Sequence, residues 1–264
     1  MEFVCRIKPH EIPLCKDKEI SPYERQRIED IVLRLQNYEP IQYILGETEF
    51  YGMTFTVNRN VLIPRPETEE LVELIINTYT AHRVPCTTHC EPYTILDIGT
   101  GSGCIAVSLA KYLPQARVYA IDNSEKALET AKYNASINKV DVQFIRQDIF
   151  EVFPSGIFPE KWDIIVSNPP YITTSEQKSM ARNVLDHEPH NALFVPDQDP
   201  LLFYKYIAGF GKKYLKENGE IYVETSALHG SDTEKMFLSE RYSSVELIKD
   251  ISGKDRIVMG KWRK

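Results

Sequence analysis

The stretch Asp97-Ile98-Gly99-Thr100-Gly101-Ser102-Gly103 decides the fold of this chain. A strand predicted over residues 94–98 runs directly into it, and an apolar helix pattern begins at Cys104. The three glycines let a ligand approach the backbone closely. Their spacing is G-x-G-x-G, not the G-x-G-x-x-G of dinucleotide folds, and the acid before them would repel a pyrophosphate. A cationic ligand, such as a sulfonium that also carries an amino group, fits this loop better.

Strand and helix patterns alternate on the C-terminal side of residue 93. Such alternation indicates a largely parallel sheet with helices on both faces, so the expected fold class is α/β. The predicted strands are 94–98, 117–121, 142–146, 162–167, 220–224, 244–249 and 256–260, and the predicted helices lie near 103–112, 124–137, 175–183, 200–216 and 230–240.

Acidic residues stand at the carboxyl ends of three successive predicted strands: Asp97, Asp122 and Asp148. Ligands of such sheets bind at this edge. Asp122 can accept from both hydroxyls of a ribose, and Asp148 can accept from an adenine amino group while Ile149 packs on the ring. Each acid alone is also typical of a strand-end turn, but three together indicate a ligand that contains ribose and adenine.

A second motif, Asn168-Pro169-Pro170-Tyr171, follows the apolar run 162–167. Two consecutive prolines cannot donate to a strand ladder, so the strand must stop there. The loop that remains offers an amide side chain, free backbone carbonyls and an aromatic ring. These groups suit holding a planar NH2 group, as in an amide or an amino-purine, although the two prolines can also serve only to end the strand.

Residues 1–47 are predicted as a small helical domain. Ser21-Pro22-Tyr23-Glu24 is typical of a helix start, with a Ser cap, Pro at the first helical position and Glu three residues after the cap. An apolar stripe then predicts packing against another element. It consists of Ile28, Ile31, Val32 and Leu35.

Residues 48–92 are predicted to hold a hairpin, a helix and a linker, and residues 93–264 the large α/β domain. The helix should start near Pro66, because prolines and acidic residues precede an apolar pattern there. Residues 80–92 are polar and contain Cys, His and Pro, which is typical of a linker.

The composition bounds the class of protein. With 264 residues, 42% of them hydrophobic, the chain can bury a sizeable core. Its net charge of −7 argues against a duplex-DNA partner, because the phosphate backbone favours a strongly basic face. No apolar run approaches the length of a membrane span and the N-terminus lacks a signal-peptide pattern. We therefore expect a cytoplasmic protein.

The five cysteines show no paired spacing, which indicates a reducing compartment. Cys86 and Cys90, with His82 and His89 nearby, are potential metal ligands. Their spacing is not that of a zinc knuckle, and no second pair follows. We therefore expect a surface linker at this point and no metal.

From Glu39 to the C-terminus the chain resembles the release-factor glutamine methyltransferases, the HemK/PrmC family. The Asn-Pro-Pro-Tyr motif is shared with amino-group methyltransferases that act on DNA and RNA, so the Pro-Arg-Pro-x-Thr-Glu element is more specific. Besides the two motifs above, the matching elements are Glu39-Pro40-Ile41-Gln42-Tyr43-Ile44, Ile63-Pro64-Arg65-Pro66-Glu67-Thr68-Glu69, Glu188-Pro189 with Ala192-Leu193, and Asp255-Arg256.

This resemblance implies a Rossmann-like, seven-stranded class I methyltransferase domain with its last strand antiparallel, preceded by a helical substrate-recognition domain and a β-hairpin. It implies methylation of the side-chain nitrogen (N5) of the glutamine in the Gly-Gly-Gln motif of peptide-chain release factors. The cofactor would be S-adenosyl-L-methionine and its product S-adenosyl-L-homocysteine, with no metal, membrane or nucleic acid. The cofactor-binding residues would be Asp97, Ile98, Gly99, Thr100, Gly101, Asp122, Asp148, Ile149 and Asn168.

The Asn-Pro-Pro-Tyr motif supplies the predicted catalytic residues. A sulfonium methyl is already activated, so the enzyme has mainly to hold the amide nitrogen about 3–3.5 Å from it. Asn168 would accept one amide hydrogen and a carbonyl of Pro169 or Pro170 the other. These acceptors would stabilise the positive charge that develops on nitrogen. Tyr171 would stack on the amide or wall the pocket.

Further substrate contacts are predicted from the segment before the helix at Pro66. Leu62 would pack on the methylenes of the glutamine. Arg65, with Glu67, would either close the site or form a structural ion pair at the helix start, and the sequence leaves both open. His187 and His190 are interpreted as ordinary loop histidines.

Three departures from the family pattern stand out. The segment before Glu39 is shorter than the usual helical domain by about one or two helices, so this domain is either truncated or reduced. Thr225-Ser226 follow Glu224 where the family often has Glu-x-Gly, which puts a direct role for that stretch in doubt. The usual Asp-Gly-Leu is replaced by Asp199-Pro200-Leu201, so that loop is expected to differ in shape.

Three alternative functions stay open on the sequence. A sister enzyme that methylates a ribosomal-protein glutamine shares both key motifs. An adenine-N6 methyltransferase shares Asn-Pro-Pro-Tyr but typically needs a basic target-recognition region, and this chain is acidic. A non-catalytic cofactor-binding module is disfavoured by the intact Asn168, Asp97 and glycines.

Overall fold

A seven-stranded sheet forms the centre of this computed structural model, which describes residues 2–15, 18–81, 92–154, 156 and 158–263. Five neighbouring strands of this sheet run parallel to one another: β9, β6, β3, β4 and β5. The last strand in the sequence, β11, is antiparallel to both of its neighbours, β9 and β10. The predicted parallel sheet with an antiparallel last strand is therefore confirmed. From edge to edge the strands are β10 (Ser243–Lys249), β11 (Asp255–Lys261), β9 (Leu215–Glu224), β6 (Trp162–Ser167), β3 (Thr94–Ile98), β4 (Arg117–Asp122) and β5 (Gln143–Arg146).

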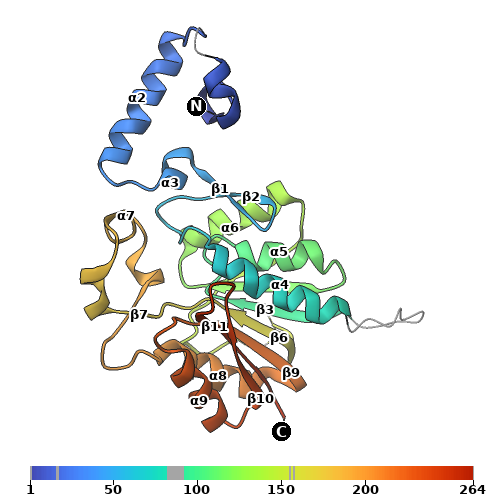
Figure 1. Cartoon of the computed structure of the whole chain (residues 1–264). Helices are drawn as coiled ribbons and strands as arrows, with labels where there is room; N and C mark the ends of the chain where they lie inside the picture. The colour runs from blue at the N-terminus through green and yellow to red at the C-terminus, as the bar shows by residue number, and fades with distance from the viewer. Residues whose placement is uncertain (1, 16–17, 82–91, 155, 157, 264) are drawn as a thin grey trace.

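Helices cover both faces of this sheet (Figure 1). α4 (Pro66–Ala81), α5 (Cys104–Tyr112) and α6 (Glu125–Asn138) lie on one face, and α8 (Leu202–Tyr214) and α9 (Gly230–Ser239) on the other. Neighbouring residues of β3 point to opposite faces. Ile95 joins the core that contains Leu109 of α5, and Leu96 joins the core that contains Tyr204 of α8. Full burial of each such side chain stabilises the fold by about 1.5–3 kcal/mol.

The N-terminal region contains α1 (Glu2–Cys5), the 3₁₀ helix η1 (Pro9–Leu14), α2 (Pro22–Gln36) and α3 (Ile41–Leu45), followed by the hairpin β1 (Glu47–Phe50) and β2 (Met53–Thr56). The predicted cap is present, because Ser21 Oγ accepts from Glu24 N at 3.2 Å. The predicted packing of the α2 stripe is wrong in part. Val32 and Leu35 are 44% and 43% exposed, since α2 stands away from the sheet (Figure 1).

The segment between β6 and α8 departs from the predicted helix over 175–183. It consists of β7 (Ile172–Thr173), the 3₁₀ helix η2 (Thr174–Ser179), α7 (Arg182–Leu185), the 3₁₀ helix η3 (His190–Ala192) and β8 (Phe194–Val195), with β7 and β8 paired in parallel. Met180 is extended and breaks the helical run. The segment reaches the end of α2, where His187 Nε2 lies 3.1 Å from Asn37 O and the Arg182 guanidinium lies 4.2 Å from the Tyr38 ring centre.

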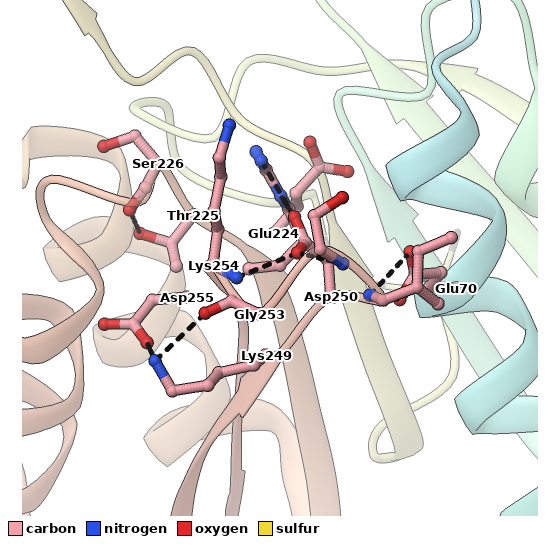
Figure 2. A network of polar contacts seen from close by, with 12 residues as sticks. Glu70, Glu224, Thr225, Ser226, Lys249, Asp250, Gly253, Lys254 and Asp255 are labelled. Carbon is pink, nitrogen blue, oxygen red and sulfur yellow. Dashed lines mark hydrogen bonds and ion pairs between the residues drawn. The ribbon is translucent and has the colours of Figure 1, made fainter.

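Asp250 organises the turn between β10 and β11 (Figure 2). Its Oδ1 accepts from the backbone N–H groups of Ser252 and Lys254, each at 2.9 Å. Its Oδ2 accepts from Nε and Nη2 of Arg256 at 3.3 Å. These bonds to the charged form lower the pKa of the Asp250 carboxyl, the backbone bond to Lys254 first among them. The turn thereby fixes Arg256 next to the end of β9.

In the described residues, no helix combines the length and the apolar character that crossing a membrane requires. The candidate metal ligands His82, Cys86, His89 and Cys90 lie outside those residues, so their predicted role as a surface linker stays a prediction.

Candidate active site

A cleft opens at the carboxyl ends of β3, β4, β5 and β6, the edge at which ligands bind in open α/β sheets. The space between its walls is about 1060 Å³, with the solvent-filled mouth included. Most of the predicted site residues meet here. Those that line the cleft are Leu62, Arg65, Ile98, Gly99, Thr100, Gly101, Asp122, Asp148, Ile149, Asn168, Pro169 and Pro170.

The glycine loop adopts backbone conformations that favour glycine. Gly99, Gly101 and Gly103 have φ values of +73°, +54° and +82°. At Gly103 a Cβ would lie 3.0 Å from the Cβ of Ala131 on α6, so the close packing of α5 on α6 also excludes a side chain. At Gly99 and Gly101 no described atom lies within 4 Å of the Cβ position. These two glycines therefore leave their backbone open to a ligand.

Asp97 lies beneath this loop rather than in the cleft wall. Its side chain is fully buried, and its Oδ2 accepts from the Thr100 hydroxyl at 2.6 Å. Its Oδ1 has no hydrogen-bond partner among the described residues. Burial raises the pKa of this carboxyl to about 7. A role in cofactor binding stays a prediction, and the geometry gives it an indirect form, through the position of Thr100.

Asp122 and Asp148 both lie in the cleft wall. Asp122 Oδ2 accepts from Gly101 N and its Oδ1 from Ser124 N, each at 2.9 Å. Burial raises the pKa of the Asp122 carboxyl. Asp148 Oδ2 accepts from Asn123 Nδ2 at 3.2 Å. Each carboxylate oxygen has a second lone pair, so both side chains keep acceptor capacity for a ligand.

A chain of hydrogen bonds begins at Asn168, which lies just after β6. Asn168 Nδ2 donates to Thr68 Oγ1 at 3.1 Å, and Thr68 Oγ1 donates to Glu224 Oε2 at 2.6 Å. The other oxygen of Glu224 accepts from the Tyr171 hydroxyl at 3.3 Å. Glu224 is 1% exposed, and burial raises the pKa of its carboxyl to about 7. This chain connects the Asn-Pro-Pro-Tyr loop to α4 and β9.

Arg65 lines the cleft and forms an ion pair with Glu188. The Glu188 side chain is 1% exposed, and its second oxygen accepts from Ile63 N at 3.2 Å. Both roles predicted for Arg65 are therefore compatible with its position, but its partner is Glu188 rather than Glu67. The ion pair ties the segment before α4 to the segment between β6 and α8.

Tyr171 lies elsewhere than the sequence predicts. The sequence assigns no role to Thr68 and leaves a direct role for Glu224 in doubt. Tyr171 does not line the cleft; its ring packs against the core under α8, and its hydroxyl points to Glu224. Its predicted stacking on a substrate amide is therefore not what this geometry supports. Thr68 and Glu224 carry the chain behind Asn168. Glu224 had a usable signal, because it follows an apolar run at a strand end just as Asp97 does.

Within the residues that the structure describes, no group of three or more His, Cys, Asp or Glu side chains is arranged to hold a metal ion. Among these described residues, the charged side chains that line the cleft are those of Arg65, Asp122 and Asp148.

Comparison with known proteins agrees with this geometry. The methyltransferase small domain family matches residues 84–193, and the PrmC N-terminal domain family matches residues 1–46. A solved structure of a methyltransferase from Pyrococcus furiosus superposes with a TM-score of 0.56 over 92% of this chain and 100% of its own, at 15% identity, and so shares the fold. The sheet, the glycine loop and the cleft thus define an S-adenosylmethionine-dependent methyltransferase.

Two curated relatives narrow this class. The release factor glutamine methyltransferase of Flavobacterium psychrophilum is 44% identical over 263 residues, which cover 100% of this chain and 90% of that protein. The release factor glutamine methyltransferase of Bacteroides thetaiotaomicron is 48% identical over 248 residues, which cover 94% and 85%. The chain belongs to the family of release factor glutamine methyltransferases.

Proposed function

We propose that this enzyme transfers a methyl group from S-adenosylmethionine to the side-chain amide nitrogen (N5) of the glutamine in the Gly-Gly-Gln motif of peptide-chain release factors. The relatives above are named for release factor glutamine methylation. The observation that carries the proposal is the orientation of Asn168. Its Nδ2 is engaged by Thr68, so its Oδ1 is the part of the amide left to accept from a substrate NH2 group.

The cleft residues fit the cofactor. Gly99 and Gly101 leave backbone open for the methionine part, Asp122 has acceptor capacity for the ribose, and Asp148 and Ile149 offer an acceptor and an apolar surface for adenine. When bound, the cofactor supplies a methyl group on a positively charged sulfur. Among the described residues, the acids at the strand ends give the cleft the charge that suits such a cation.

Positioning is the main task of the remaining residues. An amide nitrogen is a poor nucleophile, because its lone pair is delocalised into the carbonyl. Asn168 Oδ1 and a backbone carbonyl of Pro169 or Pro170 accept its two hydrogens and hold it in line with the methyl group. They also stabilise the positive charge that develops on nitrogen. The same acceptors would reject a glutamate side chain, which would leave them unpaired.

Substrate recognition by the N-terminal region is part of this proposal. α2 has no buried residue and exposes apolar side chains on a helix that stands away from the sheet (Figure 1). Such a surface suits contact with a protein better than contact with a nucleic acid. The residues concerned are Tyr23, Val32, Leu33 and Leu35. Action in the cytoplasm, without a nucleic-acid partner, stays a prediction.

Labelling tests the choice of substrate. The enzyme is incubated with methyl-labelled S-adenosylmethionine and a purified release factor, and the labelled residue is mapped by mass spectrometry. A release factor whose Gly-Gly-Gln glutamine is replaced by alanine serves as the matched control. We expect label on that glutamine and none on the control. Label on a ribosomal-protein glutamine or on an adenine of DNA, offered in parallel, with none on the release factor would overturn the proposal.

A further inference from the structure

The side chain of Asn168 can serve the proposed reaction in only one of its two orientations. The amide carries an acceptor on one side and two donors on the other. A substrate NH2 group needs the acceptor. We infer that Thr68 and Glu224 are positioning residues that fix the Asn168 amide with its oxygen toward the reacting nitrogen. This inference rests on the proposed function and adds the device that makes Asn168 competent.

Hydrogen-bond accounting sets the direction of the chain. A hydroxyl has one hydrogen to donate, and an ionised carboxylate can only accept. Thr68 must therefore give its hydrogen to Glu224 Oε2, at 2.6 Å. Its oxygen can then only accept from Asn168, which lies 3.1 Å away through Nδ2. The charge on Glu224 thus fixes which end of the Asn168 amide faces away from the cleft.

The surroundings of Glu224 come from five elements. Thr68 and Glu67 face it from α4, Cys104 from α5, Tyr171 from the loop after β6, Tyr204 from α8 and Arg256 from β11. Arg256 and the Thr68 and Tyr171 hydroxyls favour the ionised carboxylate, whereas burial and Glu67 oppose it. Figure 2 shows Glu224 with the turn whose Asp250 anchors Arg256. Burial outweighs the favourable groups and raises the pKa of the Glu224 carboxyl to about 7, so this carboxyl changes its protonation state near neutral pH.

Protonation of Glu224 would reverse the chain. A neutral carboxyl can donate its own hydrogen to Thr68, and the Thr68 hydroxyl can then donate to the oxygen of Asn168. The amide would turn its NH2 toward the cleft, where it opposes the hydrogens of the substrate. The pKa of Glu224 is raised to about 7, so the active orientation is present above that pH and is lost as the pH falls through it.

Substitution of Thr68 tests the relay. Thr68→Val keeps the shape but removes the hydroxyl, and Thr68→Ser restores it. We expect Thr68→Val to lower kcat at least about ten-fold, with the KM for release factor and the Kd for S-adenosylmethionine changed less than about three-fold. Thr68→Ser should return kcat to within about three-fold of the wild type. Thr78→Val, the same change on the same helix, where the hydroxyl bonds Leu74 O, is the control.

The pH profile supplies a readout that a structural role would not move. The kcat of the wild type should fall below about pH 7. Glu224→Gln cannot ionise, and its amide, like the protonated carboxyl, can donate to Thr68, so its kcat at about pH 8 should fall toward the low-pH value of the wild type and the acid limb should be lost. If the kcat of Glu224→Gln falls below about pH 7 just as that of the wild type does, that fall belongs to another group, such as Asp97, and the inference is overturned. A folded Glu224→Gln with the wild-type kcat at about pH 8 would also overturn it.

The outcomes separate this inference from the function it rests on. A Thr68→Val enzyme with wild-type kcat, beside an inactive Asn168→Ala enzyme, overturns the relay and leaves the proposed function intact. A fully active Asn168→Ala enzyme overturns the proposed mechanism itself. Thermal melting of every variant identifies those that fail to fold, and if Thr68→Val is among them, the profiles of the wild type and Glu224→Gln decide the matter.

Discussion

The two ends of the cleft are built in different ways. At the proposed cofactor end, around the glycine loop, hydrogen bonds join residues that lie close in the sequence. The Thr100 hydroxyl donates to Asp97, three residues away, and Gly101 N donates to Asp122, at a separation of 21 residues. The acceptor end is assembled from distant parts of the chain. Asn168 and Thr68 are 100 residues apart, and Thr68 and Glu224 are 156 apart. The end proposed to hold the cofactor is thus encoded in short motifs, and the end proposed to hold the acceptor depends on tertiary structure.

The largest effect should come from the acceptor end. Asn168→Ala removes a preorganised hydrogen-bond acceptor, so we expect kcat to fall about 100-fold or more. The Kd for S-adenosylmethionine should change much less than it does in Asp122→Ala. Turnover by single-turnover labelling and affinity by calorimetry give the two values. Near-normal methylation of release factor would show that the acceptor end does not work through Asn168.

At the cofactor end we expect a smaller effect, on the affinity for the cofactor rather than on kcat. Asp122→Ala removes the acceptors proposed for a ribose, and it removes the hydrogen bonds that Gly101 N and Ser124 N donate to this carboxylate. Hydrogen bonds to charged groups are each worth about 1.5–3 kcal/mol, so the Kd for S-adenosylmethionine should rise about 10–100-fold. The kcat at saturating cofactor should stay within about three-fold of the wild type. The exposed Asp141→Ala is the control, and an equal weakening in that variant would remove the contrast between the two ends.

The ion pair across the acceptor end should matter for stability. Arg65→Ala leaves the buried Glu188 carboxylate without its cation. Loss of one partner of a fully buried pair costs about 3–5 kcal/mol, but Arg65 is 31% exposed, so we expect a loss of about 1–2 kcal/mol in the free energy of unfolding. Urea denaturation measures it. Lys235→Ala, which breaks an exposed pair with Asp232, should change stability by less than about 0.5 kcal/mol. If Arg65→Ala and Lys235→Ala lower the free energy of unfolding equally, water solvates the Glu188 carboxylate and the prediction is wrong.

Sequence patterns predicted the local half of this molecule well. The strand ends, the glycine loop and the order of helices follow from periodicity and from residues that lie close in the chain. Asp122 and Asp148 were found because acids at strand ends converge on one edge of a parallel sheet. Glu224 obeys the same rule, but Thr225-Ser226 follow it where the family often has Glu-x-Gly, so the sequence leaves its role in doubt.

The remainder could not be predicted from local pattern. The partner of Arg65 depends on where the segment between β6 and α8 runs, and that segment is held by two short strands and isolated turns. Tyr171 was placed on the wrong side of its loop, because the direction of a side chain after two prolines depends on what it can bond, here Glu224. The exposed stripe of α2 looks from its spacing like a buried one, since periodicity cannot show whether a partner is present.

The position of β11 inside the sheet has a consequence for how the protein is made. β11 is the last of the seven strands along the chain, yet it lies between β9 and β10. Synthesis proceeds from the N-terminus, so one edge of β9 has no strand to pair with until residues 255–261 have left the ribosome. Arg256 belongs to that strand and its charge favours the ionised Glu224 carboxylate, so this support is missing until β11 has been synthesised. An unfinished nascent chain should thus be able to form the glycine loop well before it can hold Asn168 ready for a substrate.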